Sequence, residues 1–245
     1  MPKILGVIPA RYNSSRLPGK ALIDIGGKSM IQRVYEQALK AQKVDAVVVA
    51  TDDQRIASHV ESFGGQVVLT RADHLNGTTR CAEVAEKMQH DFQVAINIQG
   101  DEPFIDPAQI DLIATLFDDP QTQIATLVKQ IEVPAQIFDE KEAKVVFSQA
   151  MEAIYFSRSP IPYLHNQPKG KWFELQPYFK HLGIYGFQMP ILIEAAAMPP
   201  TPLELAESLE QIRWLERFTI KIAISQTDTL AIDTPDDLTK IQAYL

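Results

Sequence analysis

Short apolar segments alternate with segments of helical periodicity through the first hundred residues, and this alternation limits the fold more than any other feature of the chain. The apolar segments have the length of buried strands and are bounded by turn-forming residues. Strands that alternate with helices form parallel sheets covered on both faces. We therefore expect an α/β fold with a mostly parallel, doubly wound sheet. The expected strands are 4–8, 46–50, 67–70 and 94–99, and the expected helices are 30–41, 53–63 and 79–89.

The pattern changes beyond Pro107. Strand-like segments there follow one another across polar or proline-rich turns with few helices between them, which favours antiparallel pairs. Residues 157–180 hold four prolines and several aromatic side chains, so we expect a long ordered loop or arm. This arm belongs to a predicted insertion near 124–190 that makes dimer contacts. The expected strands are 124–130, 143–147, 153–156, 182–187 and 221–225.

One amphipathic helix is expected over residues 203–218. Leu205, Leu209 and Ile212 recur at steps of four and three, which puts them on one helical face turned to the core. No internal repeat or low-complexity segment is visible along the chain.

Composition indicates a folded protein with a local rather than an extended anion site. A chain of 245 residues that is 46% hydrophobic can bury a full core, and we expect a single domain over 1–245. Its net charge of -8 argues against nucleic acid as a partner. The single cysteine, Cys81, excludes an intramolecular disulfide and is expected to pack within a helix. Without a leader pattern or a long apolar run, we expect no membrane insertion and a cytoplasmic location.

A cationic loop follows the first expected strand. It carries Arg11, Arg16 and Lys20, while two prolines and a glycine restrict its freedom and lower the entropic cost of ordering it. In open parallel sheets, ligands bind outside the carboxyl ends of the strands. Cations clustered at the carboxyl end of a strand indicate a phosphate-bearing ligand, although a solvated basic loop is the alternative.

The local charge favours the anion site. Residues 1–28 contain five basic side chains and one acidic, a net +4 that leaves -12 for the rest of the chain. The segment Gly27-Lys28-Ser29 resembles the end of a P-loop, but Leu22 stands where that motif needs a glycine. No G-x-G-x-x-G follows the first strand either. A P-loop NTPase and a Rossmann dinucleotide site are therefore unsupported.

Two aspartates are candidates for holding Mg²⁺. Asp101 follows the strand 94–99 directly after Gly100, which permits a sharp turn. Magnesium is held by one or two carboxylates plus substrate phosphates, so one distant partner suffices, and Asp233 offers it. Asp233 is equally well explained as the start of a C-terminal helix with Pro235 in its first turn. Glu102 is consistent with a turn residue.

Several polar residues lie among apolar segments in the second half of the chain. Each by itself is better explained as a satisfied core or surface residue than as a ligand contact. The five histidines show no metal-ligand spacing, and nothing supports a Ser-His-Asp triad or a zinc site. The residues concerned are Arg158, His181, Tyr185, Glu210 and Gln211.

Together these segments form a pattern that resembles the CMP-KDO synthetases, the 3-deoxy-manno-octulosonate cytidylyltransferases. The resemblance runs nearly end to end. The first marker alone indicates only a sugar nucleotidyltransferase, and the later ones narrow the family. The markers are 8–12, 15–20, 50–52, 99–103, 155–158, 181–186, 209–213 and 233–235.

The resemblance implies transfer of CMP from CTP to the anomeric hydroxyl of 3-deoxy-D-manno-octulosonate (KDO), with release of pyrophosphate, for lipopolysaccharide assembly by a homodimer. It implies catalytic roles for Arg11, Lys20, Asp101 and Asp233, the two aspartates holding Mg²⁺. The implied nucleotide contacts are Pro9, Ala10, Arg11, Arg16, Lys20, Thr51, Gly77, Thr78, Gln99 and Gly100. The implied contacts to the acidic eight-carbon sugar are Arg158, His181, Tyr185, Glu210 and Gln211.

One loop departs from the family pattern. Members usually carry Ser-Gly-Thr followed by an acid and Arg, whereas this chain has Asn76 in place of the serine and Thr79 in place of the acid. Either base recognition uses different hydrogen bonds, or the exchange is neutral at a helix start, where Asn and Thr both cap. A cytidylyltransferase for a modified sugar, such as an 8-amino KDO or another acidic sugar, therefore stays open, as does a nucleotide-binding protein without turnover.

Overall fold

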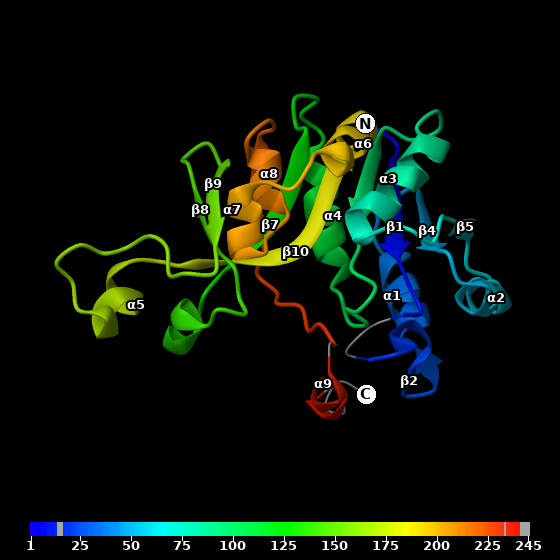
Figure 1. Ribbon diagram of the computed structural model, residues 1–245, viewed down its shortest axis with the longest axis horizontal. Helices are drawn as coiled ribbons and strands as arrows, with labels where there is room; N and C mark the ends of the chain where they lie inside the picture. The colour runs from blue at the N-terminus through cyan, green and yellow to red at the C-terminus, as the bar shows by residue number, and fades with distance from the viewer. Residues whose placement is uncertain (14–16, 233, 241–245) are drawn as a thin grey trace.

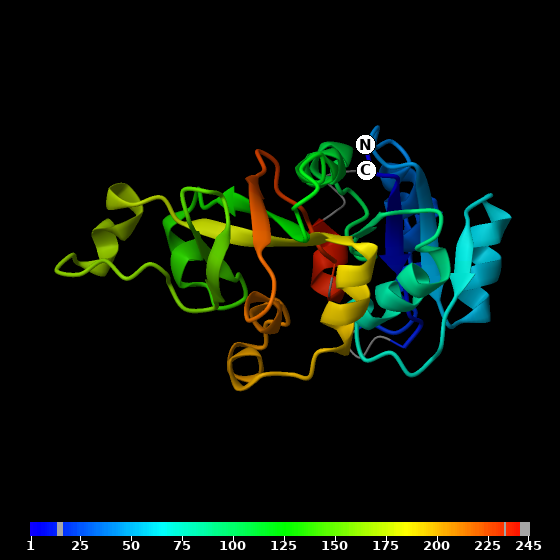
Figure 2. The same cartoon turned by 90° about the horizontal axis from the view of Figure 1, so that it is seen from above.

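The computed structural model describes residues 1–13, 17–232 and 234–240, and a mixed sheet runs along its length (Figures 1 and 2). The strands are β1 (Ile4–Pro9), β2 (Asp24–Ile25), β3 (Lys28–Ser29), β4 (Ala46–Thr51), β5 (Val67–Leu69), β6 (Val94–Asn97), β7 (Ile124–Gln130), β8 (Lys144–Phe147), β9 (Ala153–Ser157), β10 (Phe179–Gln188) and β11 (Ile220–Ile224). The α-helices are α1 (Met30–Ala38), α2 (Gln54–Ser62), α3 (Gly77–Met88), α4 (Pro107–Leu116), α5 (Trp172–Leu175), α6 (Met189–Ala197), α7 (Pro202–Glu207), α8 (Gln211–Leu215) and α9 (Pro235–Lys240). Short 3₁₀ turns are η1 (Lys20–Leu22), η2 (Pro134–Phe138) and η3 (Lys169–Lys171).

The first half of the chain forms the parallel part of the sheet. β1 pairs in parallel with β4 and β6, and β4 pairs in parallel with β5. Alternate residues of β1 enter two different cores: Ile4 and Ile8 belong to the one with α1, α2 and α4, whereas Leu5 and Val7 belong to the one with α3 and α6. Helices therefore cover both faces, and Figure 2 shows α4 and α6 on opposite sides of β10. The predicted α/β class is confirmed.

The second half adds antiparallel strands. The long strand β10 runs antiparallel to β6, β7 and β8, and β8 runs antiparallel to β9. β11 pairs in parallel with β7. The segment from β8 to α5 projects at the end of the molecule opposite α2 (Figure 1), and its Trp172 joins a small core with residues from either side of the segment. That core consists of Ile131, Ile137, Trp172 and Tyr178.

The prediction of a single helix over 203–218 is wrong. The chain forms α7 and α8 instead, separated at Ser208, whose φ of 51° is left-handed. Thr201 starts α7 with a capping box, so the helix begins and ends on local signals. Leu205 consequently lies on the surface, 67% exposed, whereas Leu209 and Ile212 are buried as predicted.

Two helices, α4 and α6, stand in the half expected to hold few. Asp106 caps α4 through a hydrogen bond from the Ala108 N–H, and Pro107 occupies its first turn. Cys81 is fully buried on α3, as expected of a packing residue. None of the helices in the described ranges is long and apolar enough to cross a membrane.

Candidate active site

A cavity of about 280 Å³ opens beside the carboxyl ends of β1 and β6. Its wall includes both cations of the basic loop that the structure describes, together with a carboxylate. Arg16 lies outside the described residues. The lining residues are Pro9, Ala10, Arg11, Lys20, Ala21, His74, Leu75, Asn76, Gly77, Arg80, Gln99, Gly100 and Asp101. We call this the phosphate cavity.

Local backbone contacts fix the end of the basic loop. The Gly19 N–H donates to the Tyr12 carbonyl at 3.0 Å, and the φ of Gly19 is 69°, a conformation that favours glycine. The guanidinium of Arg55 lies 3.3 Å from the centre of the Tyr12 ring. Lys20 follows as the first residue of η1, and its Nζ donates to Asp101 Oδ2 at 2.8 Å. The loop thus delivers an ammonium group to the carboxylate across the cavity.

Gly100 lets the loop after β6 approach the end of β1. A Cβ atom at this position would lie 2.8 Å from the Pro9 carbonyl oxygen, a distance that only glycine avoids. Next to it, the Gln99 side-chain amide donates to the Gly183 carbonyl at 2.6 Å and links this loop to β10. The close approach brings Asp101 to the basic loop.

Arg80 also lines the phosphate cavity, and our sequence reasoning did not assign it a role. Its side chain is 4% exposed and pairs with Asp52 at 2.7 Å. Its guanidinium also donates to Thr70 Oγ1 at 2.5 Å. Thr51, by contrast, is fully buried away from the cavity, and its hydroxyl accepts from the Asp53 N–H. The sequence did offer a signal for Arg80: it lies in the family segment 76–80, and its partner Asp52 lies in the family segment 50–52.

A second cavity of about 200 Å³ adjoins the first, since Gly77 and Gln99 line both. It brings together side chains from α3, β6, β10 and α8. Three of the predicted sugar contacts are among them. The lining residues are Gly77, Thr78, Asn97, Gln99, Tyr185, Glu210, Gln211 and Trp214. We call this the sugar cavity.

Three buried polar atoms of the sugar cavity find no hydrogen-bond partner within the described parts of the chain. They are Asn97 Oδ1, the Tyr185 hydroxyl and Trp214 Nε1. Asn97 and Tyr185 face each other in the antiparallel register of β6 and β10. Because buried polar groups are normally paired, such a cluster indicates a polar ligand. Asn97 and Trp214 escaped the sequence reasoning, since each looks like an ordinary strand or core residue.

His181 lies next to this cavity rather than in its wall, with its ring 5.0 Å from that of Tyr185. Burial lowers the pKa of its imidazole to about 3, so the ring is neutral near pH 7. The Thr126 hydroxyl donates to the Ile184 carbonyl and lies 2.9 Å from His181 Nε2. Since that hydroxyl has one proton, Nε2 must be the donor, which leaves Nδ1 as an acceptor.

The structure places Arg158 outside both cavities. Its guanidinium donates to the carbonyls of Glu207, Glu140 and Ser208, and its N–H donates to the Glu207 carboxylate. These contacts join the end of β9 to the turn between α7 and α8.

Asp101 is suited to magnesium as one oxygen ligand. Its carboxylate lines the phosphate cavity, and a hard cation there would share it with phosphate oxygens. The Ile232 N–H donates to the Asp101 carbonyl at 2.9 Å; Asp233, the second predicted ligand, lies outside the described residues. Burial raises the pKa of Glu102 to about 8, and its carboxyl faces Thr229 instead. Within the described ranges no group of three or more potential metal ligands occurs.

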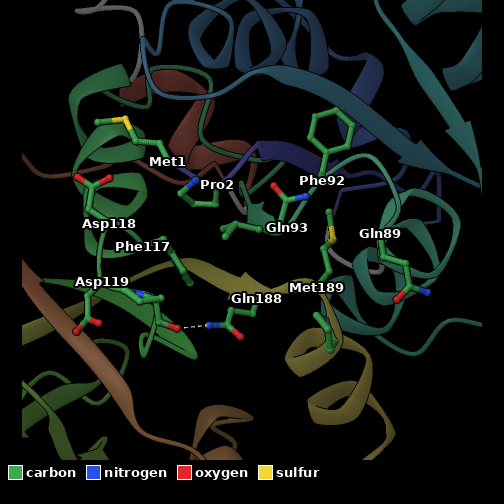
Figure 3. A pocket seen from close by; sticks show the side chains of 13 residues that line it. Met1, Pro2, Gln89, Phe92, Gln93, Phe117, Asp118, Asp119, Gln188 and Met189 are labelled. Carbon is green, nitrogen blue, oxygen red and sulfur yellow. Dashed lines mark hydrogen bonds between the residues drawn. The ribbon is translucent and has the colours of Figure 1, made fainter.

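A larger cavity of about 610 Å³ lies at the opposite edge of the sheet, beside the amino ends of β1 and β6 (Figure 3). Its lining is mostly apolar, with Phe92, Phe117 and Met189 among the labelled side chains, and its charged side chains are Asp118 and Asp119. Two carboxylates repel a triphosphate. Despite its size, this cavity is therefore less suited to a nucleotide than the phosphate cavity.

Comparison with known proteins agrees with this geometry. The Cytidylyltransferase family model matches residues 5–222. Curated 3-deoxy-manno-octulosonate cytidylyltransferases are 49% identical in Bacteroides thetaiotaomicron (99% of this chain, 98% of that one) and 44% identical in Porphyromonas gingivalis (99% and 96%).

Solved structures extend the comparison. A CMP:2-keto-3-deoxy-manno-octonic acid synthetase complexed with CTP superposes with a TM-score of 0.91 at 43% identity, over 99% of this chain and 98% of that one. A putative glucose-1-phosphate thymidylyltransferase from Bacillus anthracis shares the fold alone, with a TM-score of 0.68 at 17% identity over 98% of this chain and 94% of that one. The chain therefore belongs to the 3-deoxy-manno-octulosonate cytidylyltransferase family of nucleotidyltransferase enzymes.

Proposed function

We propose that this protein transfers CMP from CTP to the anomeric hydroxyl of KDO and releases pyrophosphate, which supplies CMP-KDO for lipopolysaccharide synthesis. The observation that carries the proposal is the adjacency of a basic cavity and a polar cavity that share Gly77 and Gln99. A nucleotide and an acceptor held in two adjoining cavities are positioned for direct attack, and positioning supplies much of the catalysis in such reactions.

The triphosphate occupies the phosphate cavity. The sugar hydroxyl loses its proton to water, its oxygen bonds to the α-phosphorus, and pyrophosphate leaves with the electron pair of the broken bond, without a covalent enzyme intermediate. Arg11 and Lys20 stabilise the negative charge that develops on the phosphates. Asp101 and Asp233, the two predicted ligands, would hold Mg²⁺, which would supply further charge neutralisation and lower the pKa of the sugar hydroxyl.

The sugar acid occupies the sugar cavity. Its hydroxyl groups both donate and accept, which complements the acceptor Asn97 Oδ1, the donor Trp214 Nε1 and the Tyr185 hydroxyl. Glu210 and Gln211 add further polar contacts. His181 contributes a hydrogen-bond acceptor rather than a positive charge, because its imidazole is neutral. The contacts of Arg158 to backbone carbonyls favour a structural role over a clamp on the sugar carboxylate.

We also propose that the chain acts as a homodimer in the cytoplasm. The projecting segment from β8 to α5 exposes large apolar side chains. Among them are Ile154, Tyr163 and Leu175, whose exposed fractions are 61%, 69% and 52%. Exposed apolar groups gathered on one segment favour an interface. The cytoplasm is where CTP is available. Light scattering of the purified protein tests the dimer, and a monomeric mass would refute it.

The deciding experiment measures pyrophosphate release from each of the four ribonucleoside triphosphates, with and without Mg²⁺ and KDO. Release that requires CTP, metal and KDO together supports the proposal. Release with an 8-amino KDO or another sugar acid in place of KDO moves the assignment to that acceptor. CTP binding without release from any acceptor indicates a nucleotide-binding protein.

Asp101→Ala tests the metal role within the same assay. We expect it to abolish turnover and to leave the thermal unfolding temperature close to that of the unaltered protein, because Asp101 lies at a cavity wall and its side chain is 31% exposed. Near-normal turnover of this variant with magnesium present would reject Asp101 as a ligand.

A further inference from the structure

The carboxylate of Glu210 lines the sugar cavity and is also bonded to a residue that lines the phosphate cavity. Its Oε1 accepts from the side-chain amide of Asn76 at 2.8 Å and from Arg213, and its Oε2 accepts from the Thr78 hydroxyl at 2.7 Å. Asn76 lines the phosphate cavity, whereas Thr78 and Glu210 line the sugar cavity. The amino end of α3 is thereby tied to the carboxylate that faces the acceptor sugar.

Asn76 makes this tie while it performs a second task. Its Oδ1 accepts from the Thr79 N–H at 2.9 Å and caps α3, and its Nδ2 donates to Glu210. A serine or an aspartate at this position would still cap the helix, but neither has an amide group that donates to Glu210. The two tasks can therefore be separated by substitution.

We propose that Asn76 is a positioning residue, which fixes the Glu210 carboxylate toward the acceptor sugar while its own backbone borders the nucleotide. This inference rests on the proposed function and adds a residue that acts on the binding of the acceptor sugar. Without the Asn76 donor, Glu210 Oε1 keeps only the contact with Arg213 among the described residues, while Oε2 keeps the Thr78 hydroxyl. Oε1 is then drawn toward Arg213, and the carboxylate pivots about its bond to Thr78 away from its orientation toward the sugar.

The test compares Asn76→Ser, which replaces the amide donor with a hydroxyl on a shorter side chain, with Asn76→Asp, which has no donor and places a second carboxylate beside Glu210. A hydrogen bond to a charged group is strong enough to change binding about tenfold. We expect the KM for KDO to rise about tenfold in the serine variant and further in the aspartate variant. In the serine variant the KM for CTP should stay within about twofold, whereas the added carboxylate of the aspartate variant borders the phosphate cavity and should raise this KM as well. The unfolding temperature of both variants should stay close to that of the unaltered protein. Asp106→Ser, a cap exchange on α4, is the control and should leave both KM values unchanged.

In Asn76→Ser, equal changes in the KM for CTP and for KDO, or no change in either, would overturn the proposal and leave Asn76 as a helix cap. A readout without substrate separates this outcome from a failure of the proposed function. The charged groups that face Glu210 are Arg213 on α8 and Glu204 on α7, and both are unchanged in these variants. A carbon-13 NMR titration should therefore find a higher pKa for Glu210 in Asn76→Ser, because a donor to its charged form is lost. An unchanged pKa would refute the link even if KDO is not the acceptor.

Discussion

Replacing Tyr185 by Phe removes one oxygen atom that should matter to the ligand and not to the fold. The Tyr185 side chain is 6% exposed, and its hydroxyl meets no partner in the described part of the chain. Its ring packs on Trp214 and Phe187, with ring centres 5.0 and 5.9 Å away. A phenylalanine keeps both ring contacts, so the substitution isolates the hydroxyl.

The expected magnitudes have opposite signs for stability and for binding. A buried polar group without a partner costs about 1–3 kcal/mol, so Tyr185→Phe should be at least as stable as the unaltered protein and up to about 1 kcal/mol more stable. For a chain of this size, that gain raises the unfolding temperature by up to roughly 4 °C. A lost hydrogen bond to a sugar hydroxyl is worth about 0.5–1.5 kcal/mol, which raises the KM for KDO roughly two- to tenfold.

Thermal unfolding and pyrophosphate-release kinetics, measured on the same preparations, check both numbers. Tyr35→Phe is the matched control: its hydroxyl is buried, donates to the Val47 carbonyl at 3.3 Å and accepts from the Gln66 N–H at 3.0 Å. That variant should lose about 1–2 kcal/mol of stability and keep its kinetic constants. If Tyr185→Phe instead destabilises the protein and leaves the KM for KDO unchanged, the hydroxyl serves the fold, and the reasoning from its missing partner is refuted.

Two further substitutions test the burial of His181 and the close backbone approach at Gly100. Because the folded state keeps His181 neutral down to a pKa of about 3 while the unfolded state takes up a proton below about 6.5, stability should fall as pH drops through this window. When the free energy of unfolding by urea is measured at pH 7 and at pH 5, the drop should be about 1–2 kcal/mol smaller in His181→Gln than in the unaltered protein. In the exposed His165→Gln the drop should be as large as in the unaltered protein. Equal drops in all three proteins would contradict the assignment of a neutral His181. Gly100→Ala places a Cβ atom 2.8 Å from the Pro9 carbonyl oxygen, so stability should fall by about 1–3 kcal/mol and the KM for CTP should rise. Gly170→Ala, whose Cβ meets open space, should change neither quantity, and wild-type behaviour of both alanine variants would show that the close approach is unimportant.

Features governed by neighbouring residues were predictable from the sequence. The strands 4–8 and 46–50 are short apolar segments with clear ends, and each lies within one residue of the observed strand. The two helices of the second half were harder, since α4 and α6 are apolar almost all round and lack the periodicity that marks an amphipathic helix. The break at Ser208 depends on one left-handed residue that no pattern indicates.

The phosphate cavity was more predictable than the sugar cavity for a related reason. A cationic loop after a strand is a local signal, and the chain direction of a parallel sheet carries it to the ligand edge. Whether Trp214 and Asn97 have a polar atom free for a ligand depends instead on which hydrogen-bond partners they lack after folding, and that is a property of the tertiary structure. Buried residues of these types are indistinguishable from core residues in a sequence.

The mixed direction of the sheet explains why the two cavities adjoin. The parallel strands β1 and β6 end at one edge, where their loops deliver Lys20 and Asp101. β10 passes the same edge in the opposite direction and sets Tyr185 directly across from Asn97. A parallel neighbour of β6 would end at this edge and place its loop there, whereas an antiparallel one continues past it and contributes its middle residues. The reversal of one strand therefore brings the sugar cavity beside the phosphate cavity, and the amide of Gln99, bonded to the Gly183 carbonyl, joins them.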